Sequence, residues 1–206
     1  KLLVSMKKKY KILIGTHNKG KFKEISYLLS NKLVKIAPDS LGIKSPKENK
    51  KTFLGNSQLK AQYFYKKSKM ISVSDDSGLS IDCLNGKPGI YSARWAKKFG
   101  NFNKAMNFII RKVKEKNKKK IKKNIKAKFT CCLTIKIPHK KIISVTGIVK
   151  GKISYTIKGK NGFGYDPIFI PENHTLTFGE MNKSKKILID HRFLAFKKLK
   201  KKINFL

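Results

Sequence analysis

Residues 72–82 read SVSDDSGLSID and set Asp75 and Asp76 side by side, directly before a Ser-Gly pair. The chain holds only 11 Asp and Glu against 50 Lys and Arg, so adjacent carboxylates stand out in it. The residues before them predict a strand that ends in an acidic loop, because Asp, Ser and Gly are common in turns. Two explanations stay open on this stretch alone: an ordinary turn at a strand end, and a metal or phosphate site.

The segments around this stretch alternate between the two hydrophobic periods. Strand patterns fall at residues 10–15, 129–137 and 141–154, and helical patterns at residues 21–30, 52–69, 102–115 and 191–203. Because strands and helices alternate first and strands then follow one another, we expect an α/β fold with a mixed sheet. We expect a single domain over residues 10–206, preceded by a basic N-terminal extension at residues 1–9.

The composition limits the classes of function. A hydrophobic content of 40% predicts a folded domain. The net charge of +39 would suit a nucleic-acid-binding protein, but only Arg94, Arg111 and Arg192 are arginines, and the lysines are spread along the whole chain. We therefore expect no specific nucleic-acid partner. We interpret the lysine run at residues 116–128 as a solvated helix end or loop rather than an anion patch.

The cysteines and the hydropathy are typical of a cytoplasmic protein. Cys83, Cys131 and Cys132 are odd in number and form no CxxC pair, which argues against a disulfide framework and a zinc site. We expect buried thiols in a reducing compartment. No apolar stretch reaches the length of a membrane span, so we expect no membrane association and a cytoplasmic location.

The stretch THNKGK, residues 16–21, lies between a predicted strand and a predicted helix. A loop there offers unpaired backbone N–H groups at a helix start, which favours an anion. Thr16, Asn18 and Lys21 add side-chain donors, and Gly20 allows close approach of the backbone to a ligand. The spacing is not that of a Walker A loop, so the stretch is a weak phosphate signal by itself.

Asp75 and Asp76 could both approach one hydrated cation at a strand end. Mg²⁺ takes one or two carboxylates together with waters and phosphate oxygens. Such an ion neutralises phosphate charge and orients an attacking water. Glu48 is a possible third oxygen ligand from a separate loop, and Lys60 on the intervening helix could pair with phosphate.

The stretch GFGYDP, residues 162–167, is a further unusual string. The glycines around Phe163 would let its ring lie against a planar ligand, with Tyr165 and Asp166 at the edge of that ligand. A glycine-rich hairpin with a core phenylalanine is the alternative. A His-Arg pair opens the basic C-terminal helix, and such a pair usually belongs to the protein surface.

These motifs occur together and in one order. The strings THNKGK, DDSGLSIDCLNGKPGIYSARWA, NGFGYDPIFIPE, TFGEM and KILIDHRFLA follow one another from about Tyr10 to the C-terminus. The series resembles the inosine triphosphate pyrophosphatase family, whose members act on non-standard purine nucleoside triphosphates. The resemblance implies an ITPase-like (Maf/ITPase) fold: an elongated mixed β-sheet flanked by helices, in two lobes with a central cleft. It also implies a homodimer.

The resemblance further implies a role for each matched position. Asp76 would be the catalytic carboxylate that binds Mg²⁺, with Asp75 and Glu48 assisting at the metal. The residues implied in substrate binding are Thr16, His17, Asn18, Lys19, Gly20 and Lys21 with Lys60 and Ser77 at the triphosphate, Phe163, Gly164, Tyr165 and Asp166 at the purine face, and Lys186, His191 and Arg192 at the base edge.

The implied reaction is Mg²⁺-dependent hydrolysis of dITP, ITP and XTP between the α and β phosphates. The 6-carbonyl of hypoxanthine or xanthine could accept from Arg192 or Lys186, whereas the amino group of adenine would set donor against donor. The alternatives are a broader Maf-type nucleotide pyrophosphatase and a nucleic-acid-binding protein that has lost catalysis. The carboxylates of Glu48, Asp75 and Asp76 argue against the second alternative, because they would repel phosphates.

Three positions depart from the pattern of the family. Gly55 stands where members often carry a glutamate, Phe193 follows the His-Arg pair in place of a glycine, and Asp190 precedes it in place of a serine. If a glutamate at Gly55 helps to hold the metal in the family, its loss here implies either reduced activity or a larger role for Glu48. Asp190 could pair with Lys186 or Arg192.

Overall fold

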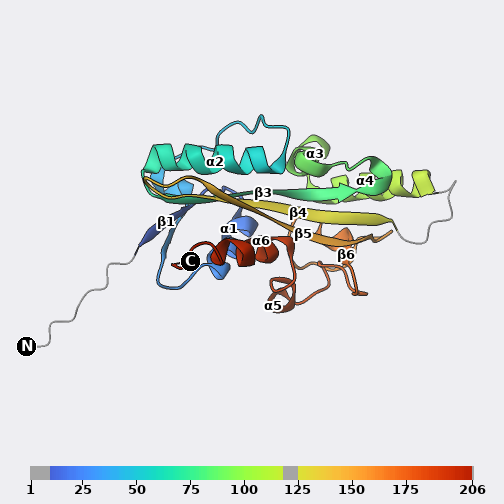
Figure 1. Cartoon of the computed structure of the whole chain (residues 1–206). Helices are drawn as coiled ribbons and strands as arrows, with labels where there is room; N and C mark the ends of the chain where they lie inside the picture. The colour runs from blue at the N-terminus through green and yellow to red at the C-terminus, as the bar shows by residue number, and fades with distance from the viewer. Residues whose placement is uncertain (1–9, 118–124, 206) are drawn as a thin grey trace, which may run out of the picture.

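The computed structural model describes residues 10–117 and 125–205 (Figure 1). The predicted extension at residues 1–9 lies outside the described residues, as do residues 118–124 of the lysine run. One six-stranded sheet runs through the described parts, in the order β2-β1-β3-β4-β5-β6. Its strands are parallel at one end and antiparallel at the other, so the prediction of a mixed α/β sheet is confirmed.

Six strands and six α-helices make up the described residues. The strands are β1 (Lys11–Ile14), β2 (Val34–Ile36), β3 (Ile71–Ile81), β4 (Lys126–Lys136), β5 (Ile143–Ile153) and β6 (Phe169–Pro171). The helices are α1 (Lys19–Leu28), α2 (Phe53–Ser68), α3 (Ser92–Phe99), α4 (Phe102–Asn117), α5 (Lys183–Lys186) and α6 (His191–Lys200). The four long helices and the three strand patterns outside β3 fall where the sequence predicts them. The short elements β2, β6, α3 and α5 were not predicted.

Helices lie on both sides of the sheet, with α2 and α3 on one side and α1, α5 and α6 on the other (Figure 1). Polar caps fix where the first two helices begin. The side chain of Asn18 accepts a hydrogen bond from the backbone N–H of Lys21 at 3.0 Å, and that of Thr52 accepts one from Gly55 at 3.0 Å. The predicted loop at residues 16–21 therefore runs into the first turn of α1.

The acidic pair does not end a strand, and the sequence-based prediction is wrong on this point. Asp75 and Asp76 lie in the middle of β3 and pair with Leu133 and Cys132 of β4. β4 continues the antiparallel ladder to Ile81, and this pairing outweighs the local turn preference of Asp, Ser and Gly. Because side chains alternate along a strand, the two carboxylates point to opposite faces of the sheet.

One edge of β3 is open beyond its first residues. β1 pairs with β3 only as far as Ile14 and Val73. Among the described residues, no further strand pairs with the rest of that edge, which carries an isolated bridge from Ser80 to Pro88 and a hydrogen bond from the backbone N–H of Leu79 to the Ser92 hydroxyl. Side chains from both faces of β3 can therefore reach the same space around this edge.

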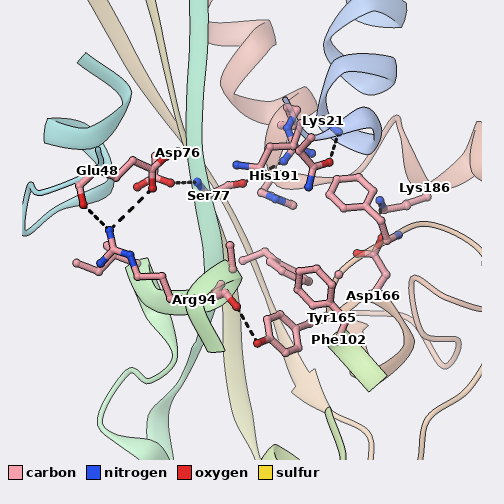
Figure 2. Close-up of a pocket in the computed structure, with 18 residues that line it drawn as sticks. Lys21, Glu48, Asp76, Ser77, Arg94, Phe102, Tyr165, Asp166, Lys186 and His191 are labelled. Carbon is pink, nitrogen blue, oxygen red and sulfur yellow. Dashed lines mark hydrogen bonds and ion pairs between the residues drawn. The ribbon is translucent and has the colours of Figure 1, made fainter. Parts of the chain in front are cut away.

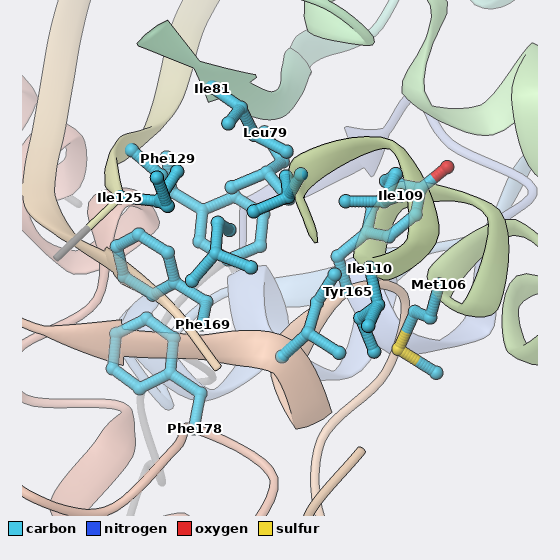
Figure 3. Close-up of a cluster of buried hydrophobic side chains, with 14 of the residues drawn as sticks. Leu79, Ile81, Met106, Ile109, Ile110, Ile125, Phe129, Tyr165, Phe169 and Phe178 are labelled. Carbon is cyan, nitrogen blue, oxygen red and sulfur yellow. The ribbon is translucent and has the colours of Figure 1, made fainter. Parts of the chain in front are cut away.

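Two separate hydrophobic clusters lie along one face of β3. The first packs α1 and α6 around Val73, and the second packs α4 around Leu79 and Ile81 (Figure 3). Asp75 and Ser77 face the same side between Val73 and Leu79, so two polar residues interrupt the apolar face. The interruption separates the two lobes and leaves a polar cleft between them.

No described helix has the length and hydrophobicity of a membrane span; the longest, α2 and α4, have 16 residues each. All three cysteines are free, with Cys131 and Cys132 buried and Cys83 half-buried. The expectation of buried thiols therefore holds for two of the three.

Gly147 of β5 determines how closely α6 approaches the sheet. A Cβ atom at this position would lie 2.1 Å from the carbonyl oxygen of His191 and 2.4 Å from the backbone nitrogen of Ala195. We predict that Gly147→Ala lowers the free energy of unfolding by about 3 kcal/mol, because the helix backbone must move away. Urea denaturation monitored by circular dichroism measures this change.

Gly42→Ala is the matched control. No atom lies within 4 Å of a Cβ at Gly42, and only its left-handed φ of 62° opposes the substitution. We expect this control to cost about 1 kcal/mol. Equal losses for the two variants would show that contact between α6 and β5 is looser than the structure indicates.

Candidate active site

The cleft at the open edge of β3 gathers most of the predicted site residues. Those that line it are Asn18, Lys21, Glu48, Asp76, Ser77, Phe163, Gly164, Tyr165, Asp166, Lys186, His191 and Arg192 (Figure 2). They come from six separate segments of the chain. The cleft has two chemically different ends. In line with the roles that the family resemblance implies, the end around Asp76 and Glu48 is called the phosphate end, and the end around Lys186 and Arg192 is called the base end.

Asp76 and Glu48 share one buried cation at the first end. The ammonium nitrogen of Lys60 lies 2.7 Å from Glu48 Oε1 and 3.9 Å from Asp76 Oδ1. Burial disfavours a charged Lys60, but the carboxylates of Asp75, Asp76 and Glu48 outweigh it and raise its pKa. Lys60 itself does not line the cleft and stands behind the two carboxylates.

The carboxylate of Asp76 is held at both oxygens. Oδ2 accepts a hydrogen bond from the amide of Asn56 at 3.0 Å, and Oδ1 accepts one from the backbone N–H of Ser77 at 3.1 Å. Only 5% of Asp76 is exposed, and this burial raises its pKa against the opposing effect of Lys60. A partly desolvated, oriented carboxylate of this kind is ready to accept a cation.

Arg94 is a functional candidate that the sequence did not single out. Its guanidinium donates to the backbone carbonyl of Glu48 at 2.6 Å and lies 4.0 Å from the Glu48 carboxylate. The same group lies 5.0 Å from the ring centroid of Tyr91. Arg94 is exposed at the mouth of the cleft (Figure 2), where a cation can meet a phosphate. Arg94 falls within the motif string that ends in YSARWA, but the sequence analysis assigned no role to it.

The second end of the cleft is built on buried ion pairs. Lys186 lies 2.7 Å from Glu24 Oε1 and 2.9 Å from Asp166 Oδ2, and Arg192 also pairs with Glu24. Arg192 is 1% exposed and Lys186 is 3% exposed. The interpretation of the His-Arg pair as surface is therefore wrong: the carboxylates of Glu24 and Asp75 make burial of the guanidinium tolerable.

Glu24 is the second residue that the sequence analysis missed. It lies on the buried face of α1 and bridges the two cations of the base end. Arg192 and Lys186 lower its pKa although burial opposes them, so the carboxylate stays ionised. A glutamate one turn into a predicted helix is ordinarily solvent-exposed, and no local signal marked this one.

Asp75 lies on the opposite face of β3 from Asp76. Its Oδ2 is 3.1 Å from the ammonium of Lys21 and 3.3 Å from the guanidinium of Arg192. These cations hold the pKa of Asp75 well below its usual range despite full burial. The carboxylate is thus occupied by two protein cations and does not line the cleft.

Only two residues of the predicted loop at 16–21 line the cleft. Asn18 and Lys21 line the cleft, whereas Thr16 is buried and accepts from the backbone N–H of Asn18 at 3.2 Å. Lys19 is exposed outside the cleft. His17 also points elsewhere, toward Ser45 at 2.6 Å and the backbone carbonyl of residue 43 at 3.0 Å.

Phe163 forms one wall of the base end. Its ring lies 5.1 Å from the Lys186 ammonium and 5.6 Å from the Arg192 guanidinium. A Cβ atom at Gly20 would lie 2.5 Å from this ring, so glycine is required where α1 meets the aromatic wall. Asp166 accepts from the backbone N–H of Phe163 at 2.8 Å and holds the loop in place.

Tyr165 and His191 face the core as well as the cleft. The Tyr165 hydroxyl donates to the backbone carbonyl of Ser92 at 2.9 Å, and its ring meets Phe102 edge to face. His191 stacks on Phe129 with ring centroids 4.7 Å apart. Burial lowers the pKa of His191 well below its usual value, so its imidazole is neutral.

The acidic end fits a Mg²⁺ ion that completes its coordination with substrate. The described residues hold no cluster of three or more His, Cys, Asp or Glu side chains that would chelate a metal alone. Mg²⁺ needs fewer protein ligands, because one or two carboxylates suffice when waters and phosphates supply the rest. Asp76 and Glu48, already gathered around one cation, meet this requirement.

Comparison with known proteins agrees with this geometry. The sequence model of the Ham1 family matches residues 12–202. The chain is 42% identical over 190 residues to the dITP/XTP pyrophosphatase of Caulobacter vibrioides, covering 92% of this chain and 96% of that protein. It is 37% identical to the dITP/XTP pyrophosphatase of Rhodospirillum centenum, covering 91% and 92%.

Solved structures of the same family have this fold. The HAM1 protein of Coxiella burnetii superposes with a TM-score of 0.84 at 27% identity, covering 96% of this chain and all of that one. The family resemblance inferred from the sequence motifs is confirmed by the family model and by the identities to curated relatives. This chain belongs to the Ham1 family.

Proposed function

We propose that this protein hydrolyses the non-standard purine nucleoside triphosphates dITP, ITP and XTP to the nucleoside monophosphate and pyrophosphate. One observation carries the proposal: a single cleft joins a carboxylate pair suited to a metal–triphosphate complex to a buried pair of cations behind an aromatic wall. The relatives named dITP/XTP pyrophosphatase support the same activity. The proposed place of action is the cytoplasmic nucleotide pool, as a homodimer.

Asp76 and Glu48 would hold Mg²⁺ at the phosphate end. When bound, the ion supplies charge neutralisation at the phosphates and a polarised water. Asp76, whose two oxygens accept hydrogen bonds from Asn56 and from the backbone N–H of Ser77, would be held in place to orient an attacking water. If the water attacks the α phosphorus, the bond from this phosphorus to the oxygen that bridges the α and β phosphates breaks. Pyrophosphate is then the leaving group, and the nucleoside monophosphate is the other product.

Donors from three elements surround the expected path of the triphosphate. Asn18 and Lys21 lie at the start of α1, where backbone N–H groups also favour an anion. Ser77 adds a hydroxyl from β3, and Arg94 adds a guanidinium from α3. We propose that Lys60 acts from behind, by keeping Glu48 and Asp76 ionised and close together.

Asp75 takes an indirect part in this proposal. It faces away from Asp76, and its ion pairs with Lys21 and Arg192 connect the phosphate end to the base end. We propose that Asp75 assists catalysis by fixing these two cations rather than by touching the metal.

The base end suits a 6-oxopurine. Phe163 offers a ring for stacking, and Lys186 and Arg192 offer donors to a carbonyl oxygen. Adenine would present an amino group to these donors, and an unpaired buried polar group costs about 1–3 kcal/mol. Discrimination against ATP then follows from hydrogen bonding rather than from shape.

The assay of purified protein tests the function directly. We predict Mg²⁺-dependent release of pyrophosphate from ITP and XTP at least about a hundredfold faster, in kcat/KM, than from ATP, which corresponds to about 2.7 kcal/mol of transition-state discrimination. Pyrophosphate and orthophosphate are quantified separately with each nucleotide. Comparable rates on ITP and UTP would instead support a broader Maf-type nucleotide pyrophosphatase. An intact fold with no turnover of any nucleotide would refute the proposal.

Asp76→Asn isolates the catalytic carboxylate. We predict a loss of activity of about a thousandfold or more, because the amide keeps the shape but neither binds Mg²⁺ as a carboxylate nor orients the water. The melting temperature should change little, since the amide oxygen can still accept from Asn56. The control Asp82→Asn alters an exposed aspartate outside the cleft. Full activity of the Asp76 variant would remove this residue from the mechanism.

Glu24→Gln tests the buried bridge of the base end. We predict a loss of about 3 kcal/mol in the free energy of unfolding, because Lys186 and Arg192 lose a shared counter-ion in a buried site. We also predict a reduced preference for ITP over ATP, since the two donors are no longer held in place. Denaturation and the nucleotide assay measure the two effects; unchanged stability and selectivity would contradict the role of the bridge.

A further inference from the structure

Seven ionisable side chains are packed together at the base end. Its carboxylates are Glu24, Asp75, Asp166 and Asp190, and its cations are Lys21, Lys186 and Arg192. Four negative charges thus face three positive ones within the ion-paired cluster. The nearby ammonium of Lys60 also interacts with Asp75, but it is ion-paired with Glu48 and Asp76 at the other end of the cleft. One negative charge of the cluster is therefore left without an ion-pair partner when all seven groups are ionised. Two other buried groups do not restore the balance. Burial keeps the pKa of His191 well below and that of Cys131 well above the usual values, so both are neutral.

Asp190 is the carboxylate without a counter-ion. The other three each have a cationic nitrogen within 3.3 Å, whereas no described cation lies within 4 Å of Asp190. Asp190 is fully buried, and its Oδ2 has no hydrogen-bond partner among the described residues. The excess negative charge of the cluster is therefore located on this side chain.

Asp190 also fixes the start of the helix that carries Arg192. Its Oδ1 accepts from the backbone N–H groups of Arg192 at 2.9 Å and Phe193 at 2.7 Å, as the N-cap of α6. The cap sets the backbone from which the Arg192 side chain extends toward the cleft. The position of the Arg192 guanidinium thus depends on Asp190.

We propose that Asp190 is a positioning and specificity-determining residue: it orients Arg192 through the helix cap, and its negative charge disfavours purine rings that are themselves anionic. This inference rests on the proposed function and extends it to the choice between substrates. Xanthine carries a second carbonyl, at position 2, and loses a ring proton more readily than hypoxanthine. Near neutral pH a xanthosine nucleotide is therefore more anionic at its base than an inosine nucleotide, and Asp190 selects against it.

The proton occupancy of Asp190 determines the pH range of this effect. The groups that act on it are Glu24 of α1, Lys186 of α5, Arg192 of α6 and Cys131 of β4, and the neutral His191 is the next residue in the chain. Burial, followed by the charge of Glu24, raises the pKa of Asp190 to about 6. The carboxylate is thus charged at pH 8 and largely neutral at pH 5.

The test compares the products IMP and XMP, whose binding reports on the base pocket without requiring turnover. Calorimetry gives the ratio of their dissociation constants for wild-type protein, Asp190→Ser and Asp190→Ala at pH 8 and pH 5. Serine retains a capping oxygen and removes the charge, whereas alanine removes both. Asp82→Ser removes an exposed negative charge elsewhere and is the control for net charge.

We expect Asp190→Ser to shift the ratio toward XMP by about tenfold at pH 8, the effect of one pKa unit of coupling, and by much less at pH 5. Asp190→Ala should shift the ratio similarly and also weaken the binding of both IMP and XMP, because the helix start that positions Arg192 loses its cap. An unchanged ratio at pH 8 in the serine variant would overturn the proposal, and so would failure of the wild-type protein to bind either monophosphate.

A second measurement uses the free protein, so that it stays independent of the proposed activity. A raised pKa means that the folded state gains stability from protonated Asp190 at low pH and loses it as pH rises through 6. The melting temperature of wild-type protein should therefore fall relative to Asp190→Ser between pH 5 and pH 7. If the difference in melting temperature between wild-type protein and Asp190→Ser were the same at pH 5 and pH 7, the assignment of the excess charge to Asp190 would be overturned. Normal binding ratios without pyrophosphate release from ITP would refute only the proposed reaction.

Discussion

The burial of Arg192 is the constraint on which the rest of the structure depends. A guanidinium that is 1% exposed requires counter-ions from elsewhere in the chain, and these come from Glu24 on α1 and Asp75 on β3. Removing one partner of such a buried pair costs about 3–5 kcal/mol. The sheet and two helices are thus held in one arrangement by charge as well as by apolar packing. Six of the eleven carboxylates of the sequence line this cleft or lie buried behind its cations, so a lysine-rich chain places its scarce acids where buried cations need them.

The cleft follows from two features of β3. β1 pairs with β3 only as far as Val73, so the rest of this edge of β3 is open. Asp75 and Ser77 interrupt the apolar face of β3 between the two hydrophobic clusters. A continuous apolar face would have joined α1, α6 and α4 over one core and closed the space. Because the edge is open, Asp76 and Ser77 reach the same cleft from opposite faces of the strand. The phosphate end and the base end are therefore neighbours, although their side chains lie on opposite faces of the sheet.

The sequence predicted the long elements and failed where tertiary contacts decide. Hydrophobic periodicity located α1, α2, α4 and α6, although only α4 buries a face that is apolar throughout. It misplaced the acidic pair, because pairing with β4 and not local turn preference determines where β3 ends. Among site residues, the motifs supplied most of the cleft lining. Glu24 was missed, because its significance depends on Lys186 and Arg192, 162 and 168 residues away. Arg94 was missed since its neighbour Glu48 lies on another segment.

The net charge of +39 and the acidic cleft act on a nucleotide at different ranges. With six carboxylates in or behind the cleft, few remain to offset the lysines of the surface, so any polyanion is attracted from a distance. Inside the cleft, Glu48 and Asp76 repel bare phosphates unless a divalent cation accompanies them. General attraction therefore does not determine which anion is processed. That choice is left to the metal requirement at one end and to the charge and hydrogen bonding of the purine at the other. The number of surface lysines can thus change without changing which nucleotide the cleft selects.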